Sequence, residues 1–368
     1  MRPLILVWIL VASFVVLGAA QDLTPSISWK NPNITSSKDD RIKIASAALD
    51  KAVSMPQPNG QFDDSLYGTP GRLYGQMAEF DRLTNQTKYK QILKQGFALA
   101  EPVNSEFSST LSSTTTLAGG TYWKTDSDKP KVASLASVFF LTLSALLAEA
   151  TSHQMYLDAA IDSANVIQSH LLNPSNIVLD PVLSMSNESC SVDSTVYSYN
   201  SGIFIEGLVV LADITRNAST EVLLRSTIVA VATDTLWQGL DGIIITTTVG
   251  GQYIVRALAA LYERNTTSSD LREYIKEYIG VQATSNGSNI YGLPWKAPPS
   301  TSFSSDNETA AVSALLSAIQ LADDQLSSAS SGDPISSATL TPSAAASSTK
   351  KSLAGAIVGG VVGGLAVL

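Results

Sequence analysis

The chain has 368 residues, and its 32 acidic and 23 basic side chains give a formal net charge of −9. The charged residues are sparse and the sequence has no basic patch, so we expect no nucleic acid partner. Only two histidines and one cysteine, Cys190, are present, and no phosphate-binding or dinucleotide-binding motif occurs. The sequence therefore predicts no metal site and no cofactor, and a fold that depends on hydrophobic burial rather than on disulfides.

Both ends of the chain have the composition of sorting signals. Residues 1–20 carry Arg2, an apolar run and a Gly-Ala-Ala ending, which is typical of a secretory signal peptide. Residues 325–351 form a Ser/Thr-rich stalk, and residues 352–368 are almost entirely apolar and glycine-rich. This last segment fits either a membrane span or a GPI-anchor signal. Both alternatives predict a protein of the secretory pathway that reaches the cell surface and is anchored in the membrane through its C-terminal segment.

Seven Asn-x-Ser/Thr sequons agree with a secretory route, because several lie in turns where glycans fit. The predicted glycosylation sites are Asn33, Asn85, Asn187, Asn217, Asn265, Asn286 and Asn307.

Residues 22–324 are predicted to form one all-α domain, because apolar residues recur there at helical spacing. Helices are expected over 39–53, 66–83, 88–99, 132–150, 156–172, 199–215, 220–235, 252–264, 270–280 and 306–323. Alternate helices begin at intervals of roughly fifty to sixty-five residues, which indicates an array of α-hairpins. Ten helices make five hairpins if the first helix packs against the last. The stretch 102–128 shows no helical period.

Such an array either closes into an α/α toroid or remains an open solenoid. Each inner helix follows a long polar segment, and a ring would bring these entry segments together at one rim. The sequence therefore favours the toroid, with a concave and aromatic-rich bowl at that rim.

Three groups of residues are candidates for chemistry at the rim. The first is Asp63-Asp64, with Tyr67 close behind, since neighbouring carboxyl groups can divide the acid and nucleophile roles of glycoside hydrolysis. The alternative is that two aspartates before a helix simply cap its N-terminus.

The other two groups combine aromatic rings with amides, which suits the stacking and hydrogen bonding of a pyranose. The second group is Tyr197, Tyr199 and Asn200, with Asp193 upstream and with Glu206 either solvated or paired with Arg256. The third consists of aromatic and amide residues in loops and helix starts. The alternative for two of them, Trp237 and Trp295, is that they pack against hairpin ends and bind no sugar. The predicted binding residues are Tyr67, Tyr122, Trp123, Tyr199, Asn200, Gln252 and Trp295.

Several of these motifs together resemble glycoside hydrolase family 76, and most of all the membrane-tethered members of basidiomycete fungi. The motifs are Asp63-Asp64, Gly119-Gly-Thr-Tyr-Trp123, Tyr199-Asn-Ser-Gly202, Gln252-Tyr-Ile-Val-Arg256 and Gly292-Leu-Pro-Trp295. The resemblance implies a six-hairpin α/α barrel, endo-hydrolysis of α-1,6-linked mannan, and a role in fungal cell-wall assembly on mannan or GPI-anchor mannose. It also implies that Asp63 is the nucleophile and Asp64 the acid/base, with an α-mannan-like glycan as the partner of a monomer.

The sequence departs from the family pattern in the position of its Asp pair, and it is also shorter than the pattern after Gln282. The consecutive Asp pair of the family lies on the second hairpin, whereas Asp63-Asp64 precede the first complete hairpin. One hairpin is therefore expected to be missing where the Ser/Thr-rich stretch stands. The competing hypothesis is a catalytically inactive carbohydrate-binding or scaffold protein of the same fold, and a third is a purely structural wall protein.

Overall fold

The computed structural model describes residues 23–64, 68–100, 117, 119–123, 131–183, 191–245, 250–264, 269–283, 291 and 302–324. The predicted signal peptide, the stalk and the C-terminal segment lie outside these residues. So do Cys190, the predicted binding residues Tyr67 and Trp295, and the sequons at Asn187, Asn265 and Asn286.

The described part of the chain contains ten α-helices, close to the ten ranges expected from the sequence. They are α1 (Lys38–Val53), α2 (Gly68–Thr84), α3 (Lys90–Ala100), α4 (Ser134–Thr151), α5 (Gln154–Val166), α6 (Ser198–Thr215), α7 (Ala218–Ala232), α8 (Gly251–Glu263), α9 (Ser269–Gln282) and α10 (Ser305–Ala318). A short π-helix, Ile167–Leu171, follows α5 directly. The last helix ends five residues earlier than expected, at Ala318 rather than at residue 323.

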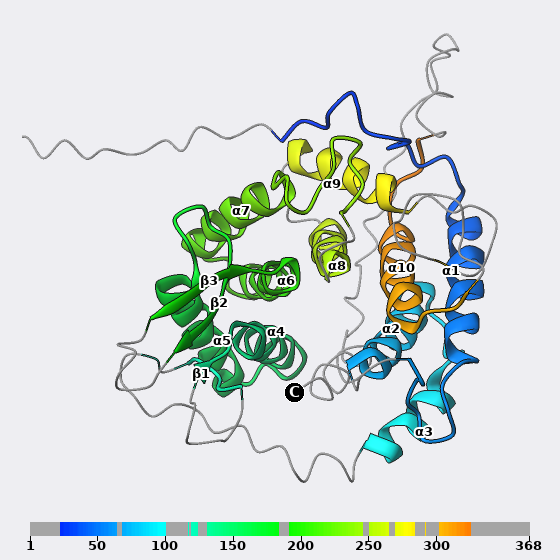
Figure 1. Ribbon diagram of the computed structural model, residues 1–368, viewed down its shortest axis with the longest axis horizontal. Helices are drawn as coiled ribbons and strands as arrows, with labels where there is room; N and C mark the ends of the chain where they lie inside the picture. Colours follow the sequence, from blue (N-terminus) through cyan, green and yellow to red (C-terminus); the bar gives the residue numbers. More distant parts are fainter. Residues whose placement is uncertain are drawn as a thin grey trace, which may run out of the picture.

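The helices form an α/α toroid, as the sequence predicted (Figure 1). The inner helices α4, α6, α8, α10 and α2 pack side by side in that order, and α5, α7, α9, α1 and α3 lie outside them. The first helix, α1, packs against the last, α10, so the two ends of the described domain meet in one hairpin. No interface of comparable extent joins α2 to α4 in the described structure, and the chain between them includes residues 101–116, which lie outside it.

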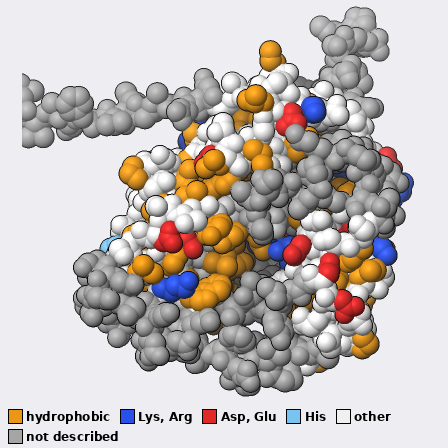
Figure 2. All heavy atoms as spheres, viewed as in Figure 1, with side chains coloured by type: hydrophobic (Ala, Val, Ile, Leu, Met, Phe, Trp, Pro, Cys, Tyr) orange, Lys and Arg blue, Asp and Glu red, His pale blue; other side chains and the backbone are white. Residues whose placement is uncertain are grey.

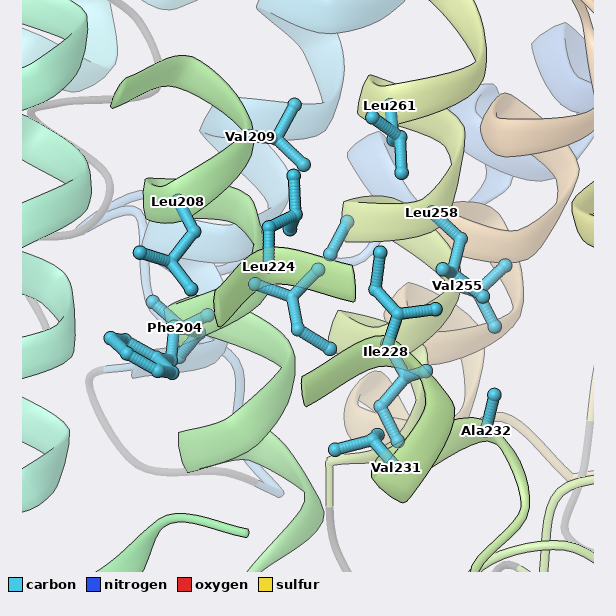
Figure 3. Packing of buried hydrophobic residues seen from close by; sticks show 14 of the residues in the cluster. Phe204, Leu208, Val209, Leu224, Ile228, Val231, Ala232, Val255, Leu258 and Leu261 are labelled. Carbon is cyan, nitrogen blue, oxygen red and sulfur yellow. The ribbon is translucent and has the colours of Figure 1, made fainter. Parts of the chain in front are cut away.

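Helix α6 is buried almost all round because it lies between α4, α7 and α8. Phe204 and Leu208 of α6 pack near Leu224 and Ile228 of α7, and Leu258 of α8 faces the same interior (Figure 3). The backbones of α6 and α8 approach so closely at Gly202 that a Cβ there would lie 2.7 Å from the Ile254 nitrogen. Helix α4 is the only described helix with the length and apolar composition of a membrane span, and half of that window is buried inside the protein.

The buried apolar side chains divide into two clusters. The large core joins α4 to α9 and includes the C-terminal end of α10. The small core is formed by α1, α2 and the middle of α10, around Leu49, Leu73 and Phe80. Charged groups help connect the two parts, because Arg82 of α2 bonds Glu263 of α8 at 2.7 Å. The two parts of the ring are therefore held by separate hydrophobic cores with polar contacts between them.

A small antiparallel sheet, which the sequence did not predict, covers the entrance to α4 and α6. It consists of β1 (Lys131–Val132), β2 (Leu179–Leu183) and β3 (Val192–Val196), in the order β1-β2-β3. Strand β3 is mostly exposed and ends directly before α6, so it lacks the apolar alternation that would reveal a strand in the sequence. The sheet places its polar side chains beside the first turn of α6.

Candidate functional site

The first turns of the inner helices gather at one rim of the ring. At one side, the Ser134 hydroxyl at the start of α4 donates to the Leu179 carbonyl of β2 at 2.5 Å. The neighbouring amide of Val178 donates to the Ser201 hydroxyl in the first turn of α6 at 3.1 Å. Strand β2 therefore bridges the entrances of α4 and α6.

The starts of α8, α2 and α10 continue this series of contacts around the rim. Gly250, just before α8, lies against Tyr199 of α6, where an added Cβ would be 2.6 Å from the tyrosine Cβ. Arg72 in α2 lies 5.7 Å from the ring centre of Tyr253 in α8, and Thr69 of α2 bonds Asp306 of α10 at 2.5 Å. This chain of contacts confirms the predicted gathering of the entry segments.

An aromatic pair stands at the start of α6. The rings of Tyr197 and Tyr199 are stacked, with centroids 5.0 Å apart and an interplanar angle of 9°. Tyr197 is 37% exposed, so the pair lies at the protein surface. Burial raises the pKa of the Tyr199 hydroxyl, and the nearby carboxylate of Asp180 adds to this. The Tyr199 hydroxyl therefore remains a protonated hydrogen-bond donor at neutral pH.

Asn200, next to this pair, is fully buried. Neither its amide oxygen nor its amide nitrogen makes a well-formed hydrogen bond to another described residue, although the side chain lies beside Asp180. A buried amide without partners is costly, at about 1–3 kcal/mol, and such groups often await a ligand or a water. Tyr199 and Asn200 thus combine a stacking surface with free hydrogen-bonding capacity.

The small sheet carries Asp193, which the sequence analysis placed beside the second group, and Asp180 and Lys131, which it missed. Asp180 of β2 and Asp193 of β3 are opposite each other in the ladder, and Lys131 of β1 lies within electrostatic reach of both. Figure 2 shows acidic and basic side chains together over these strands. Asp180 gave no signal in the sequence because it lies in a strand that periodicity did not reveal.

Three residues of the third predicted group, Tyr122, Trp123 and Gln252, lie near the small sheet or the start of α8. Tyr122 pairs with Val132 in an isolated bridge, and the Trp123 amide donates to the Lys131 carbonyl at 3.1 Å. The Lys131 ammonium lies 5.9 Å from the centre of the Trp123 ring. Gln252 is buried in the first turn of α8, next to the Gly250 turn that touches Tyr199.

Asp63 and Asp64 lie in the turn before α2, on the side of the rim where α2 and α10 begin. Both are exposed. The Gln57 amide donates to Asp63 at 2.8 Å, and the backbone amide of Ser305 donates to Asp64 at 2.8 Å. Asp64 therefore caps α10, a different helix from the one it precedes. Within the described structure, the pair reaches Tyr199 only indirectly, through the first turn of α10, Arg72 of α2 and the start of α8.

A buried carboxyl group, Glu308, lies in the first turn of α10 and was not anticipated. The Tyr291 amide donates to one carboxyl oxygen at 2.9 Å, and the other oxygen has no partner among the described residues. Burial raises the pKa of Glu308 to about 7. Its position follows from the packing of α10 against α1 and α2, which no local pattern reveals.

Two other candidates have structural roles. Glu206 pairs with Arg256 at 2.5 Å, which was one of its two expected roles. Trp237 is 2% exposed and belongs to the large core, as expected of a residue that closes a hairpin end.

The described sequons occupy helix ends and loops. Asn33 and Asn85 are exposed, and Asn217 is exposed at the N-cap of α7, where its side chain accepts from the Ser219 amide at 2.9 Å. Asn307 is half-buried in the first turn of α10. Their glycosylation stays a prediction.

The family model described as glycosyl hydrolase family 76 matches residues 97–322. The chain belongs to this family. The match covers the large part of the ring together with α10, and it begins after Asp63 and Asp64. A search of curated proteins found no match to the chain.

Solved structures show the same fold at low sequence identity. An inactive variant of the α-1,6-mannanase GH76A of Salegentibacter sp. HEL1_6, in complex with α-1,6-mannotriose, is 15% identical, with a TM-score of 0.63 over 77% of this chain and 100% of that one. The Lin0763 protein of Listeria innocua is 16% identical, with a TM-score of 0.62 over 76% and 97%. Dfg5 from Chaetomium thermophilum, in complex with glucosamine, is 13% identical, with a TM-score of 0.61 over 77% and 91%.

Proposed function

We propose that this family 76 member binds α-1,6-linked mannose chains at the rim of its toroid and hydrolyses them internally. The observation that carries the proposal is the stacked pair Tyr197–Tyr199 beside the buried amide of Asn200, which lies against Asp180 and makes no well-formed hydrogen bond within the described structure. The apolar face of a pyranose stacks on aromatic rings, while its hydroxyls need donors and acceptors of the kind that Asn200 supplies. The structural relative in complex with α-1,6-mannotriose supports the choice of sugar and linkage.

Hydrolysis requires two carboxyl groups with different roles. The consecutive pair Asp63-Asp64 is the first candidate, with Asp63 as nucleophile and Asp64 as acid/base. Both carboxylates are exposed, and each accepts a single described hydrogen bond, so both are accessible from solvent.

The test is turnover of an α-1,6-mannan by the wild type and by the Asp63→Asn and Asp64→Asn variants. Release of shorter oligosaccharides by the wild type, and its loss in both variants, is the result expected for this assignment. Unchanged turnover in the variants would show that the reacting carboxyl groups lie elsewhere. Asp39→Asn, in the first turn of α1, is a matched control for removal of an exposed carboxylate near a helix start.

A second candidate function is glycan binding without hydrolysis. It is favoured by the role of Asp64 as the cap of α10 and by the position of the pair before the matched region. Calorimetry with α-1,6-mannotriose separates the two functions, because a binder gives a heat of association and no product.

The setting of this activity is also a proposal. Residues 1–20 and 352–368 suggest an exported protein held at the cell surface, where mannan or the mannose of GPI anchors would be its substrate in wall assembly. Recovery of the full chain in the soluble cytosolic fraction, without N-linked glycans, would contradict this setting.

A further inference from the structure

We propose that the inside of the ring holds a second sugar position around Tyr253, about one helical turn below the tyrosine pair of the rim. This inference rests on the proposed binding of a mannose chain, and it extends that binding from the rim into the ring. Arg72 of α2 and Arg256 of α8 flank the Tyr253 ring, with their guanidinium carbons 5.7 and 5.5 Å from its centre. These three side chains supply hydrogen bonds to the hydroxyls of one mannose unit.

Tyr253 faces the inside of the ring, because it contacts helices that are not its neighbours. Among the inner helices, α8 packs directly against α6 and α10. The Tyr253 ring nevertheless meets the Phe139 ring of α4, past α6, with centroids 6.4 Å apart and an interplanar angle of 86°. In the other direction it meets Arg72 of α2, past α10. Contacts that skip a neighbouring helix in both directions place Tyr253 on the face of α8 that looks into the ring.

Close packing at Gly202 sets the level of this tyrosine. A Cβ added at Gly202 of α6 would lie 2.9 Å from the Tyr253 Cβ, so the absence of a side chain lets the tyrosine approach α6. Gly202 follows Tyr199 by three residues, a little less than one helical turn. The rim pair and Tyr253 therefore lie at two successive levels on the path from the rim into the ring.

The side chains around Tyr253 keep hydrogen-bonding capacity that no described residue uses. Glu206 accepts from Nε of Arg256 at 2.9 Å and from Nη2 at 2.5 Å, which fixes the guanidinium and leaves Nη1 for a ligand. The Arg256 side chain is 39% exposed. Arg72 donates from Nη1 to the Thr309 hydroxyl at 3.0 Å, whereas its buried Nε has no acceptor within the described structure. The hydroxyl of the half-buried Tyr253 adds a further donor and acceptor.

Charged groups at the opposite end of the ring bind one another. Arg264, at the end of α8, bonds both carboxyl oxygens of Glu149 of α4, at 2.5 and 3.1 Å. It also bonds Asp213 of α6 at 3.0 Å. These ion pairs join the last turns of three inner helices, so the ring is cross-linked at its far end and a glycan enters from the rim.

The chemistry at the level of Tyr253 suits a neutral sugar better than an anion. The two guanidinium groups are balanced by two carboxylates, Glu206 beside Arg256 and Asp306 at 3.7 Å from Arg72. Figure 2 shows basic and acidic side chains together near the middle of this face. Hydroxyl oxygens of a pyranose accept from arginine and tyrosine, and its C–H groups suit neighbouring aromatic rings. The ligand expected here is therefore a further unit of the mannose chain bound at the rim.

The test is the dependence of affinity on chain length, measured by calorimetry. The ligands are sulfur-linked analogues of α-1,6-mannobiose and α-1,6-mannotetraose, which resist hydrolysis. The wild type should bind the tetraose about tenfold or more tightly than the biose, a difference of about 1.4 kcal/mol, because only the longer chain occupies both positions. Tyr253→Phe and Arg72→Gln should each reduce this ratio to about threefold or less, since each removes hydrogen bonds at the inner position alone. Their affinity for the biose should stay within about twofold of the wild type.

The controls separate a binding role from a structural one. Arg272→Gln is matched to Arg72→Gln, because Arg272 of the outer helix α9 stacks on Tyr262 at 3.7 Å, and it should keep the wild-type ratio. Arg72→Lys retains a charged donor and should restore part of the ratio. Tyr253→Phe keeps the aromatic ring and guards against a folding defect in the Arg72 variants. Equal thermal unfolding midpoints check that all variants fold.

The outcomes distinguish this inference from the proposed function. Equal affinity of the wild type for both ligands, or a ratio that survives Tyr253→Phe and Arg72→Gln, overturns the inner position and leaves binding at the rim intact. Absence of binding of either ligand overturns both. Loss of the ratio in Tyr253→Phe and Arg72→Gln, with Arg272→Gln unchanged, supports the inference.

Discussion

The two parts of the ring differ in how their helices are held together. In the large part, α6 and α8 share a dry interface in which Gly202 brings the two backbones into contact. In the small part, α2 packs on α1 and α10 through Leu73, Met77 and Phe80, and Gly75 of α2 has open space where a side chain would be. The comparison teaches that the part in which two inner helices touch backbone to backbone carries the sheet and the tyrosine pair, whereas the part that packs through side chains carries Asp63-Asp64.

The largest effect should come from removing a buried ring in each part. Phe204→Ala in the large core and Phe80→Ala in the small core should each cost about 3–5 kcal/mol of stability. The two variants should differ in how many helices they destabilise. Phe80→Ala should raise hydrogen exchange mainly in α1, α2 and α10, whereas Phe204→Ala should raise it throughout the ring. Equal exchange in all helices of the Phe80→Ala variant would show that the two parts form a single cooperative unit.

The next effect concerns the pH dependence of the small part. Burial raises the pKa of Glu308 from an ordinary 4.5 to about 7, so the folded state holds a proton that the unfolded state releases. Stability from this group is therefore complete below pH 4.5 and is lost as the pH rises through 7, by at most about 3 kcal/mol.

Glu308→Gln should flatten this dependence, as measured by thermal unfolding at pH 5 and pH 8. Glu221→Gln, on the exposed face of α7, should leave the difference between the two pH values unchanged. An unaltered slope in Glu308→Gln would mean that Glu308 is ionised in the folded protein.

The polar contact between the two parts should matter less. Arg82 bonds Glu79 at 2.5 Å and Glu263 at 2.7 Å, and burial raises the pKa of Glu263. Arg82→Gln leaves two carboxylates side by side, and we expect a loss of about 2 kcal/mol at pH 8 that shrinks at pH 5 as they take up protons. Lys43→Gln, which breaks only the exposed pair with Asp40, should leave the stability nearly unchanged, because solvent screens that pair. Similar losses of stability in both variants would show that the Arg82 contact contributes no more than an exposed ion pair does.

The smallest effect compares two glycines. Gly202→Ala should cost about 1–2 kcal/mol, because its methyl group would meet the backbone of α8. Gly75→Ala should instead stabilise the protein by about 0.5–1 kcal/mol, since its methyl group meets nothing and alanine favours the helix. Urea unfolding of both variants measures the contrast, and a gain in stability from Gly202→Ala would contradict the close packing of α6 on α8.

The sequence predicted the helices and the ring well because their signals are local and repeated. The apolar positions of α6, such as Phe204 and Leu208, recur at helical spacing, and the polar entry segments indicated a common rim. The sheet was missed because β3 is exposed and short, and Asp180 was missed with it. The cap of α10 by Asp64 joins residues 241 positions apart, so local pattern could indicate a capping role but not which helix receives it.

The central claim is that the ring gathers its helix entrances into one sugar-binding rim, with Tyr199 at its centre. Calorimetric titration of α-1,6-mannotriose into the wild type, Tyr199→Ala and Tyr156→Ala measures it most directly, since Tyr156 lies on the outer helix α5. We expect Tyr199→Ala to weaken binding about tenfold or more, because loss of a stacking ring typically costs over 1 kcal/mol. Tyr156→Ala should bind as the wild type does. Unchanged affinity in Tyr199→Ala, or no binding by the wild type, would contradict the account.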